Sequence, residues 1–330
     1  MRLGDICSKI GSGATPRGGK EAYSTSGIPI IRSQNVLDWS FSSNGLAYLN
    51  DEQAKTLSNV EVHQGDILLN ITGDSVARAC IVPSDVIPAR VNQHVAILRP
   101  KEKANATFIL AWLQTNKDLL LKLASSGATR NALTKRMLEG LDINLPSIDI
   151  QNHIAELISL IQSKINLNIK LNGYLLELAT TRFEQALFKS NRVVRLGDIV
   201  KLEDSKRVPL NSRDRDARKG PYPYYGATSI MDYVDDYLFD GIRVLLGEDG
   251  SVIDESGRPI LQYVWGKYWV NNHAHILAAA SDYSLEAIYI ALQRTPISHI
   301  VTGAVQRKIS QRNLNKLKLE MPDAKSLEYL

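Results

Sequence analysis

Two polar segments of this chain combine side chains that suit the binding of nucleic acid. Residues 125–131 (SSGATRN) supply hydroxyls, an amide and a guanidinium, and residues 302–308 (TGAVQRK) supply similar groups with different identities. Hydroxyls and backbone N–H groups bind phosphates, whereas arginine can pair with guanine, and asparagine with adenine, through two hydrogen bonds. The two segments could therefore read two different short sequences. The alternative is that both are ordinary polar loops.

Positive charge is concentrated around both segments. The 330 residues include 39 Lys and Arg against 35 Asp and Glu, and this formal net charge of +4 does not by itself indicate a nucleic-acid-binding protein. Residues 119–138 and 294–318, however, contain several basic residues and no acidic ones. Segregation of this kind lets a protein of modest net charge present a focused positive surface.

The sequence lacks the motifs of several catalytic classes. It contains no G-x-x-x-x-G-K-[ST] phosphate loop, no G-x-G-x-x-G between a strand and a helix, and no Asn/Asp-Pro-Pro-aromatic motif of amino-methyltransferases. His273 and His275 could share a metal if both lie on one strand, but no third ligand cluster stands near them. We therefore predict a binding protein with no catalytic centre, metal or cofactor of its own.

The cellular setting is predicted from what the chain lacks. Cys7 and Cys80 are too few for a disulfide framework. No signal peptide is visible, and no apolar stretch approaches the ~20 residues that span a bilayer. These features predict a soluble cytoplasmic protein.

The elements that must position the two polar segments occur twice along the chain. The sequence RLGDI at residues 2–6 returns at 195–199, and VNQHVAIL at 91–98 resembles VNNHAHIL at 270–277. Shorter matches follow in the same order: Ser/Thr-Gly-Ala at 126–128 and 302–304, then Leu/Met-Pro at 145–146 and 321–322. Ordered matches predict two copies of one domain that differ by insertions and deletions.

A segment with a different residue pattern separates the copies. Residues 149–189 contain no proline and one glycine, and their apolar residues recur at the spacings of three and four that are typical of a helix. A helix of this length would extend for about 60 Å. Asn168 and Asn172 interrupt the apolar stripe, as polar residues do in coiled coils that fix their register. We favour a coiled-coil-type helix over a long surface helix with solvated polar positions.

Each copy has a mixed texture that predicts an α+β fold with strands predominating. Short β-rich runs occupy residues 28–31, 66–71 and 91–98, and turn residues separate them. A helix is expected over 107–124, with a counterpart over 285–293. The predicted organisation is thus two strand-rich domains joined by the long helix. Its predicted boundaries are 1–148, 149–192 for the helix, 193–322, and a final segment 323–330.

These residues together resemble a known family. Two copies that begin with Arg-Leu-Gly-Asp-Ile and close with Ser/Thr-Gly-Ala and Leu/Met-Pro, with a long helix after the first proline, are similar to the specificity subunits of type I restriction-modification enzymes. The resemblance covers nearly the whole chain. It implies a non-catalytic subunit in which each copy is a target recognition domain that reads one half of a bipartite double-stranded DNA site.

The resemblance also implies partners. In the family, the long helix sets the spacing of the half-sites and docks modification subunits, which bind S-adenosylmethionine and methylate adenine. A separate restriction subunit, a motor-nuclease, cuts unmodified DNA. The family pattern would continue into a second long helix after Pro322, where residues 323–330 remain here. We therefore expect an exposed apolar face that contacts a modification subunit or a second copy of this chain, through Ile154, Ile158, Ile161, Ile165 and Leu175.

By the same analogy, a DNA-binding face is expected in each copy. In the first copy it would comprise Arg17, Lys20, Arg32, Gln34, Asn35, Gln93, His94, Ser125, Ser126, Thr129, Arg130, Asn131 and Lys135. In the second copy it would comprise Lys206, Arg207, Tyr225, Thr228, Asn272, His273, Thr302, Gln306, Arg307 and Lys308. The alternative from another class is a two-headed scaffold or ligand-binding protein on a helical rod. Steep loss of affinity in salt would distinguish a DNA binder from it.

Overall fold

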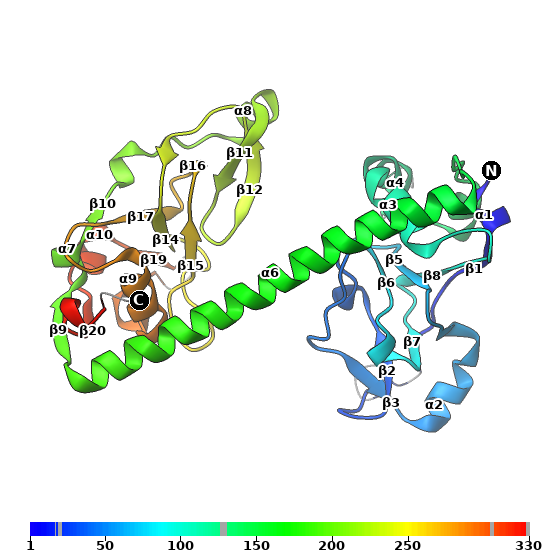
Figure 1. The fold of residues 1–330 in the computed structure, drawn as a ribbon, viewed down its shortest axis with the longest axis horizontal. Helices are drawn as coiled ribbons and strands as arrows, with labels where there is room; N and C mark the ends of the chain where they lie inside the picture. Colours follow the sequence, from blue (N-terminus) through cyan, green and yellow to red (C-terminus); the bar gives the residue numbers. More distant parts are fainter. Residues whose placement is uncertain (17, 19–21, 126–130, 304–306, 328–330) are drawn as a thin grey trace. The chain divides into compact units, whose positions relative to one another are not determined.

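The computed structural model describes residues 1–16, 18, 22–125, 131–303 and 307–327, which form two compact units, Met1–Asn168 (unit 1) and Ile169–Leu330 (unit 2). Figure 1 shows the strands and helices of each unit. Among the described residues, no helix is both long and apolar enough to cross a membrane.

Unit 1 contains, within its described part, two four-stranded sheets. The first sheet has the order β1-β8-β5-β6 and comprises β1 (Cys7–Ser12), β5 (Ile67–Asn70), β6 (Ala79–Ile81) and β8 (Val95–Pro100). The second sheet has the order β3-β2-β7-β4 and comprises β2 (Ile28–Ile31), β3 (Ala47–Leu49), β4 (Glu61–Val62) and β7 (Ala89–Val91). All pairs are antiparallel except β2 with β7.

Unit 2 repeats this topology strand for strand. Its first sheet, β10-β17-β14-β15, comprises β10 (Val200–Leu202), β14 (Arg243–Gly247), β15 (Leu261–Val264) and β17 (Ala274–Ala279). Its second sheet, β12-β11-β16-β13, comprises β11 (Lys219–Tyr225), β12 (Ile230–Val234), β13 (Phe239–Asp240) and β16 (Lys267–Val270), and again one pair, β11 with β16, is parallel. The described residues thus confirm the predicted α+β fold and its duplication.

Short helices and strands complete both units. In unit 1 these are α1 (Leu3–Ile6), α2 (Asp51–Thr56), α3 (Ala106–Thr115), α4 (Lys117–Ser125), α5 (Lys135–Glu139), η2 (Ser33–Asn35), η3 (Ser58–Val60) and η4 (Ser84–Val86). In unit 2 they are β9 (Arg192–Arg195), α7 (Leu196–Ile199), η5 (Asp204–Lys206), α8 (Ser212–Ala217), α9 (Leu285–Arg294), η6 (Ser298–Ile300), β18 (Val301–Thr302), β19 (Lys308–Ile309), α10 (Gln311–Asn315), β20 (Lys318–Met321) and η7 (Ala324–Leu327). The repeated RLGDI sequence forms α1 and α7.

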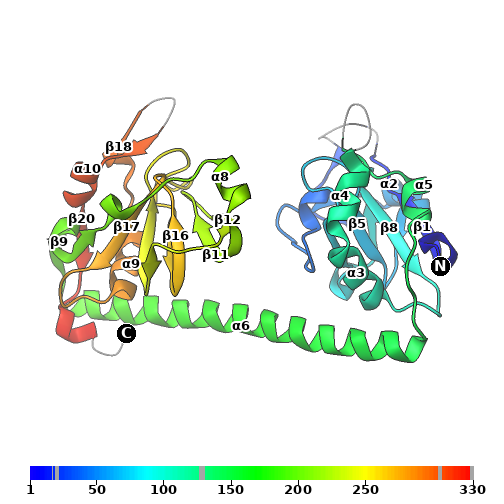
Figure 2. The ribbon, with the colours of Figure 1, turned by 90° about the horizontal axis from the view of Figure 1, so that it is seen from above.

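The first sheet of each unit is buried on both faces, because helices cover one face and the second sheet covers the other. In β5, Ile67 and Leu69 pack with α1 and α3, whereas Leu68 packs with the strands of the second sheet. In β14, Val244 and Leu246 pack with α9, and Leu245 faces the other way. Alternate residues of a strand point to opposite faces, so continuous apolar runs are what such central strands require. Figure 2 shows α3 and α4 beside β5 and β8.

The predicted long helix is α6 (Ile148–Lys189), which is 42 residues long. Its N-terminal turn is anchored in unit 1 by the buried Gln151, whose Oε1 accepts a hydrogen bond from the Asn105 N–H at 2.9 Å. Near its other end, Phe183 is fully buried in the core of unit 2. Between these anchors most large apolar side chains of α6 are exposed: Leu157, Leu160, Ile161, Ile165, Leu167, Ile169, Leu171, Tyr174, Leu175, Leu176 and Leu178.

Two predicted elements are each divided in the structure. The helix expected over 107–124 is broken at Asn116, whose side-chain Nδ2 donates to the carbonyl of Trp112 at 2.8 Å and ends α3. The strand expected over 91–98 ends at Val91 and resumes at Val95. A side chain that bonds nearby backbone groups offers the chain an alternative to helix or strand, which is the physical reason for both breaks.

Candidate nucleic-acid interface

The interruption between β7 and β8 is a turn held by asparagine and carrying histidine. The side-chain Oδ1 of the buried Asn92 accepts the His94 N–H at 3.1 Å, which turns the chain between the two strands. The His94 ring then lies against the loop after β5, with 2.6 Å between Nδ1 and the Thr72 hydroxyl. We call residues 92–94 the Asn-x-His turn of unit 1.

Two further segments meet at this turn. Residues 131–133, which follow the polar segment noted in the sequence, pair with the loop after β5, because the Gly73 N–H donates to Asn131 at 3.4 Å and the Leu133 N–H donates to Ile71 at 2.8 Å. On another side, Nδ2 of the buried Asn70 donates to the carbonyl of Ser33 at 2.9 Å. Three polar loops distant in sequence thus converge at one end of unit 1.

Unit 2 builds the same arrangement from equivalent strands. The Oδ1 of Asn271 accepts the His273 N–H at 2.8 Å, and the His273 Nδ1 lies 2.6 Å from a carboxylate oxygen of Asp249, in the loop after β14. The Gly250 N–H donates to Arg307 at 3.0 Å. The Asn271 N–H donates to Tyr225 at 3.0 Å, as Asn92 does to Ile31 in unit 1.

The chemistry at the two turns nevertheless differs. His94 has a neutral hydroxyl as its partner, whereas His273 has a carboxylate. In unit 2, the guanidinium of Arg207 donates to the carbonyl of Ala274 at 2.7 Å and contacts Glu248 at 2.6 Å. Glu248 also lies 3.3 Å from the exposed ammonium of Lys308. Unit 2 therefore presents a charged version of the surface that is largely neutral in unit 1.

The predicted interface residues differ in how accessible the structure leaves them. Exposed side chains belong to Gln34, Gln93, Ser125, Asn131, Lys135, Lys206, Thr228, Asn272, Thr302, Arg307 and Lys308. Half-buried side chains belong to Arg32, His94, Arg207, Tyr225 and His273. Asn35 is buried, and its amide donates to the carbonyls of Ser42 and Asn44, so it organises its own loop. Arg17, Lys20, Ser126, Thr129, Arg130 and Gln306 lie outside the described residues.

Sequence reasoning missed the residues that orient the two histidines. Thr72 and Asp249 were not among the expected residues, although each stands in a Gly-containing loop directly after a central strand of its repeat. The buried asparagines Asn92 and Asn271 were visible as the shared letter of the V-N-x-H motif. A comparison of the two copies position by position would have identified the two asparagines and the two loop residues, since the members of each pair occupy equivalent places in the repeat.

A compact cluster of ionisable groups lies beneath the surface of unit 2. Ligand atoms of Asp204, Glu248 and His275 lie within 4.8 Å of one another, a spacing that suits a metal ion. The guanidinium of Arg207 contacts Glu248 at 2.6 Å and Asp204 at 3.6 Å, and both ring nitrogens of His275 have hydrogen-bond partners. The arrangement is therefore an ion-pair network in which a cationic side chain already neutralises the carboxylates.

The two histidines of unit 2 that could have shared a metal contact separate carboxylates. His273 lies in the turn before β17 and contacts Asp249, whereas His275 lies within β17 and contacts Asp204. Because the strand begins at Ala274, the alternation expected along a strand does not apply to His273.

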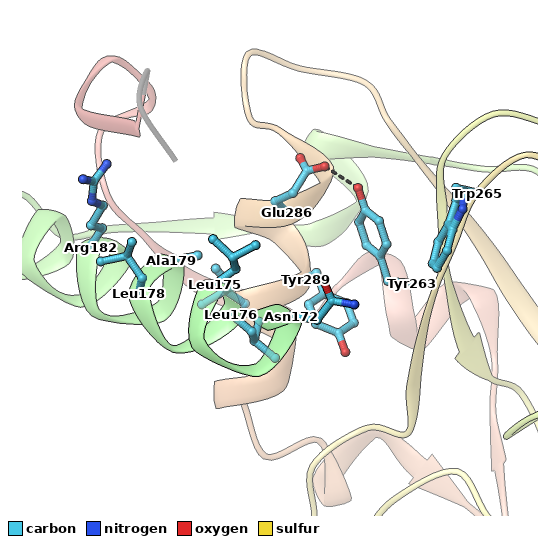
Figure 3. Close-up of a pocket in the computed structure, with 11 residues that line it drawn as sticks. Asn172, Leu175, Leu176, Leu178, Ala179, Arg182, Tyr263, Trp265, Glu286 and Tyr289 are labelled. Carbon is cyan, nitrogen blue, oxygen red and sulfur yellow. Dashed lines mark hydrogen bonds between the residues drawn. The ribbon is translucent and has the colours of Figure 1, made fainter. Parts of the chain in front are cut away.

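The expected partner-binding residues of α6 fall into two groups. Ile154 and Ile158 are half-buried against unit 1, whereas Ile161, Ile165 and Leu175 are 62%, 45% and 53% exposed. Leu175 lines an apolar pocket of about 670 Å³ between α6 and the residues of β15 and α9. In Figure 3 the Tyr263 hydroxyl of this pocket bonds to Glu286, and Trp265, which is 70% exposed, stands at its edge.

A duplicated α+β fold, with an equivalent polar loop cluster on each copy and one long helix running from the first into the second, defines a class of two-domain proteins. The chain belongs to the family of type I restriction modification DNA specificity domains, whose profile matches residues 1–175 and 189–326. This confirms the resemblance drawn from the sequence.

Individual relatives agree with this assignment. A Haemophilus influenzae protein named as a type I restriction enzyme specificity subunit is 30% identical over 127 residues, and the match spans 38% of this chain and 32% of that protein, about a third of its length. A specificity subunit of Methanocaldococcus jannaschii is 20% identical over 97% of this chain and 82% of its own. The solved S subunit of a type I restriction-modification system from M. genitalium shares the fold, with a TM-score of 0.53, 14% identity, and coverage of 99% of this chain and 85% of that chain.

Proposed function

We propose that this chain is the DNA-reading specificity subunit of a type I restriction-modification complex, and that each unit contacts one half of a bipartite double-stranded site. The observation that carries the proposal is that both units build the same loop cluster on equivalent strands but place different side chains on it. Two similar scaffolds with different polar tips are what reading two different half-sites requires. Membership in the DNA specificity family supports it.

The exposed residues around each Asn-x-His turn divide by their chemistry. Gln93 and Asn272 are exposed amides next to the turn histidines, and amides pair with adenine through two hydrogen bonds. Lys308 and Lys135 are exposed ammonium groups, which suit phosphates as point charges. Arg307 can serve either role, because a guanidinium binds guanine or phosphate with two N–H groups.

We further propose that catalysis resides in partner subunits that assemble on α6. The modification subunits would bind S-adenosylmethionine and methylate adenine, and a restriction subunit would cut unmodified DNA. The exposure of Ile161, Ile165 and Leu175 supports this, because large apolar side chains that gather on one helix favour burial against another protein. The alternative occupant of the same face is a second copy of this chain.

The proposal predicts that Arg307→Ala weakens the reading of one half-site and leaves the other unchanged. The chain and its modification subunits are incubated with a pool of random double-stranded DNA, and the bound fragments are sequenced to give the preferred bases of each half. If Arg307 contacts a base edge, the substitution costs about 1 to 3 kcal/mol at that half-site. Lys201→Ala is the charge-matched control, because Lys201 is exposed on β10 opposite Ala278.

Two other outcomes of this selection would change the interpretation. An equal loss of affinity for every sequence would make Arg307 a phosphate contact. A wild-type complex that enriches no sequence, and whose DNA binding does not weaken as salt is raised, would contradict the proposed function and favour a two-headed scaffold.

A further inference from the structure

A buried histidine and aspartate lie directly beneath the proposed DNA-reading loop of unit 2. The side chains of His275 and Asp204 are 0% and 2% exposed, and their Nδ1 and Oδ2 atoms are 2.6 Å apart. The other ring nitrogen of His275, Nε2, lies 2.9 Å from the backbone carbonyl oxygen of Ile309. One ring thus joins η5 to β19, two segments that are distant in sequence.

Both ring nitrogens of His275 face hydrogen-bond acceptors. The Ile309 carbonyl beside Nε2 can only accept a hydrogen bond. Burial alone would raise the pKa of Asp204, but hydrogen bonds from His275 and the Ile276 N–H, and the charges of His275 and Arg207, outweigh it and lower that pKa. The carboxylate beside Nδ1 is therefore an acceptor as well, and the ring links it to the backbone of Ile309.

The charges around the ring are balanced. Arg207 adds a second cation, 3.6 Å from Asp204 and 2.6 Å from Glu248, and Glu248 adds a second anion, 3.7 Å from the His275 Nδ1. Lys308 on β19 contacts Glu248 from the solvent side at 3.3 Å. Gln311 on α10 donates to Asp204 at 2.6 Å. Buried charges persist when they are paired in this way, and breaking one partner away is costly.

Unit 1 shows that the fold itself does not need this pair. Leu202 pairs with Leu277 in unit 2, and Ile10 pairs with Leu98 in unit 1. Asp204 lies two residues after Leu202, beyond the end of β10 and in η5, and His275 lies two residues before Leu277 on β17. The same steps in unit 1 reach Ser12 and Ala96, which pair with each other. The pair is therefore peculiar to unit 2, where β19 follows Arg307.

We propose that Asp204 and His275 are positioning residues that hold the Arg307–Ile309 segment in place for DNA reading by unit 2. The hold consists of the contacts that the His275 ring makes with the Asp204 carboxylate and the Ile309 carbonyl. Loss of these contacts would affect the backbone next to Arg307 and Lys308, which the proposed function places at the DNA. This inference rests on that function.

Two variants separate positioning from mere stability. Asp204→Ser with His275→Ala gives unit 2 the residues that unit 1 has at these positions. Asp204→Asn is the conservative variant, because its amide keeps hydrogen-bonding groups beside Nδ1 of His275 while Nε2 still faces the Ile309 carbonyl. The double variant should lose the hold, and Asp204→Asn should keep it.

The experiment is the random-DNA selection described above, with the full chain and its modification subunits. Arg307→Ala identifies which half of the preferred sequence belongs to unit 2. Discrimination at that half should be about tenfold weaker in the double variant than in the wild type, the effect of losing one or two hydrogen bonds. Asp204→Asn should equal the wild type, and the half read by unit 1 should not change in either variant.

His273 and Asp249 remain in every variant, so their contact cannot account for a difference between the variants. Wild-type discrimination by the double variant, or a loss in Asp204→Asn as large as in the double variant, would overturn the inference alone. If the double variant fails to fold, the single variant His275→Ala is compared with Asp204→Asn in the same way. A wild-type complex that enriches no sequence would overturn the proposed function and this inference with it.

Discussion

Asp66 and Arg243 occupy the same place in the two units and carry opposite charges. Asp66 directly precedes β5 and Arg243 is the first residue of β14, and the residues that follow them, Ile67 and Val244, pair with the equivalent Leu98 and Leu277. The buried Asp66 binds Arg99 through two hydrogen bonds of 2.8 Å, and Arg243 binds Glu203 at 2.7 Å. An ion pair therefore occupies this point in both units with the signs exchanged, which shows how far two copies can diverge while keeping one fold.

The ion pair between Asp66 and Arg99 should stabilise unit 1. Asp66→Ala should destabilise unit 1 by about 2 to 3 kcal/mol, because it removes the partner of Arg99 and the acceptor of the His63 N–H. The expected loss of stability is smaller than for a fully buried ion pair, because the Arg99 side chain is 24% exposed and solvent screens its charge. Urea unfolding of the full chain measures the change, with the exposed Glu102→Ala as control.

Equal unfolding midpoints for Asp66→Ala and Glu102→Ala would show that Arg99 finds other partners at no cost, and the stabilising role of the pair would be withdrawn.

At the scale of elements, some features follow from the sequence and others do not. Repeated RLGDI segments, apolar runs and a long helical stripe each depend on local sequence pattern, and they predict the duplicated fold and α6 well. The Asn-x-His turns cannot be predicted in this way, because residues 91–98 have the composition of a strand. The strand is interrupted because the side chain of Asn92 accepts a hydrogen bond from the His94 N–H. The partners Thr72 and Asp249 come from loops brought near only by folding.

A close backbone approach in unit 1 is another feature that spacing could not reveal. Gly13 follows β1, and its N–H donates to Val95 at 3.0 Å, while the next N–H donates to Val91 at 3.0 Å. A Cβ at Gly13 would lie 1.9 Å from the carbonyl oxygen of Val91. Glycine at this position therefore lets β1 run beside the strand end that leads into the Asn-x-His turn.

We predict that Gly13→Ala destabilises unit 1 by about 2 kcal/mol or more, because the backbone of Val91 must move to admit the new methyl group. Since that movement displaces the Asn-x-His turn, reading of the first half-site should also weaken. Gly11→Ala is the matched control: nothing lies within 4 Å of a Cβ there, so stability should change by less than about 1 kcal/mol. Thermal unfolding of both variants checks this, and similar losses for both would refute the role of the close approach.

At the scale of the whole molecule, the proposed function depends on apolar side chains that neither of the two cores buries. Each unit buries its own apolar residues, whereas the middle of α6 keeps a series of large apolar side chains in solvent. A monomeric protein rarely exposes so continuous an apolar surface without a binding purpose. In the proposed function, duplication supplies two reading surfaces, and the helix that joins them supplies the surface on which other subunits would assemble.

Charged residues placed on the exposed side of α6 should disrupt the proposed assembly. Ile161 and Ile165 are four residues apart, on the same side of α6, and both are exposed. Replacing both with lysine should weaken binding of the modification subunits at least about tenfold, since two buried apolar side chains contribute well over 1.4 kcal/mol. Stability of the chain itself should not change. Ser163→Lys adds the same kind of charge at an exposed polar position between them and should have a smaller effect. Sedimentation of the chain alone and mixed with modification subunits measures both interactions: loss of self-association in the variant would identify a second copy as the occupant, and unchanged behaviour in both would show that this part of α6 binds neither.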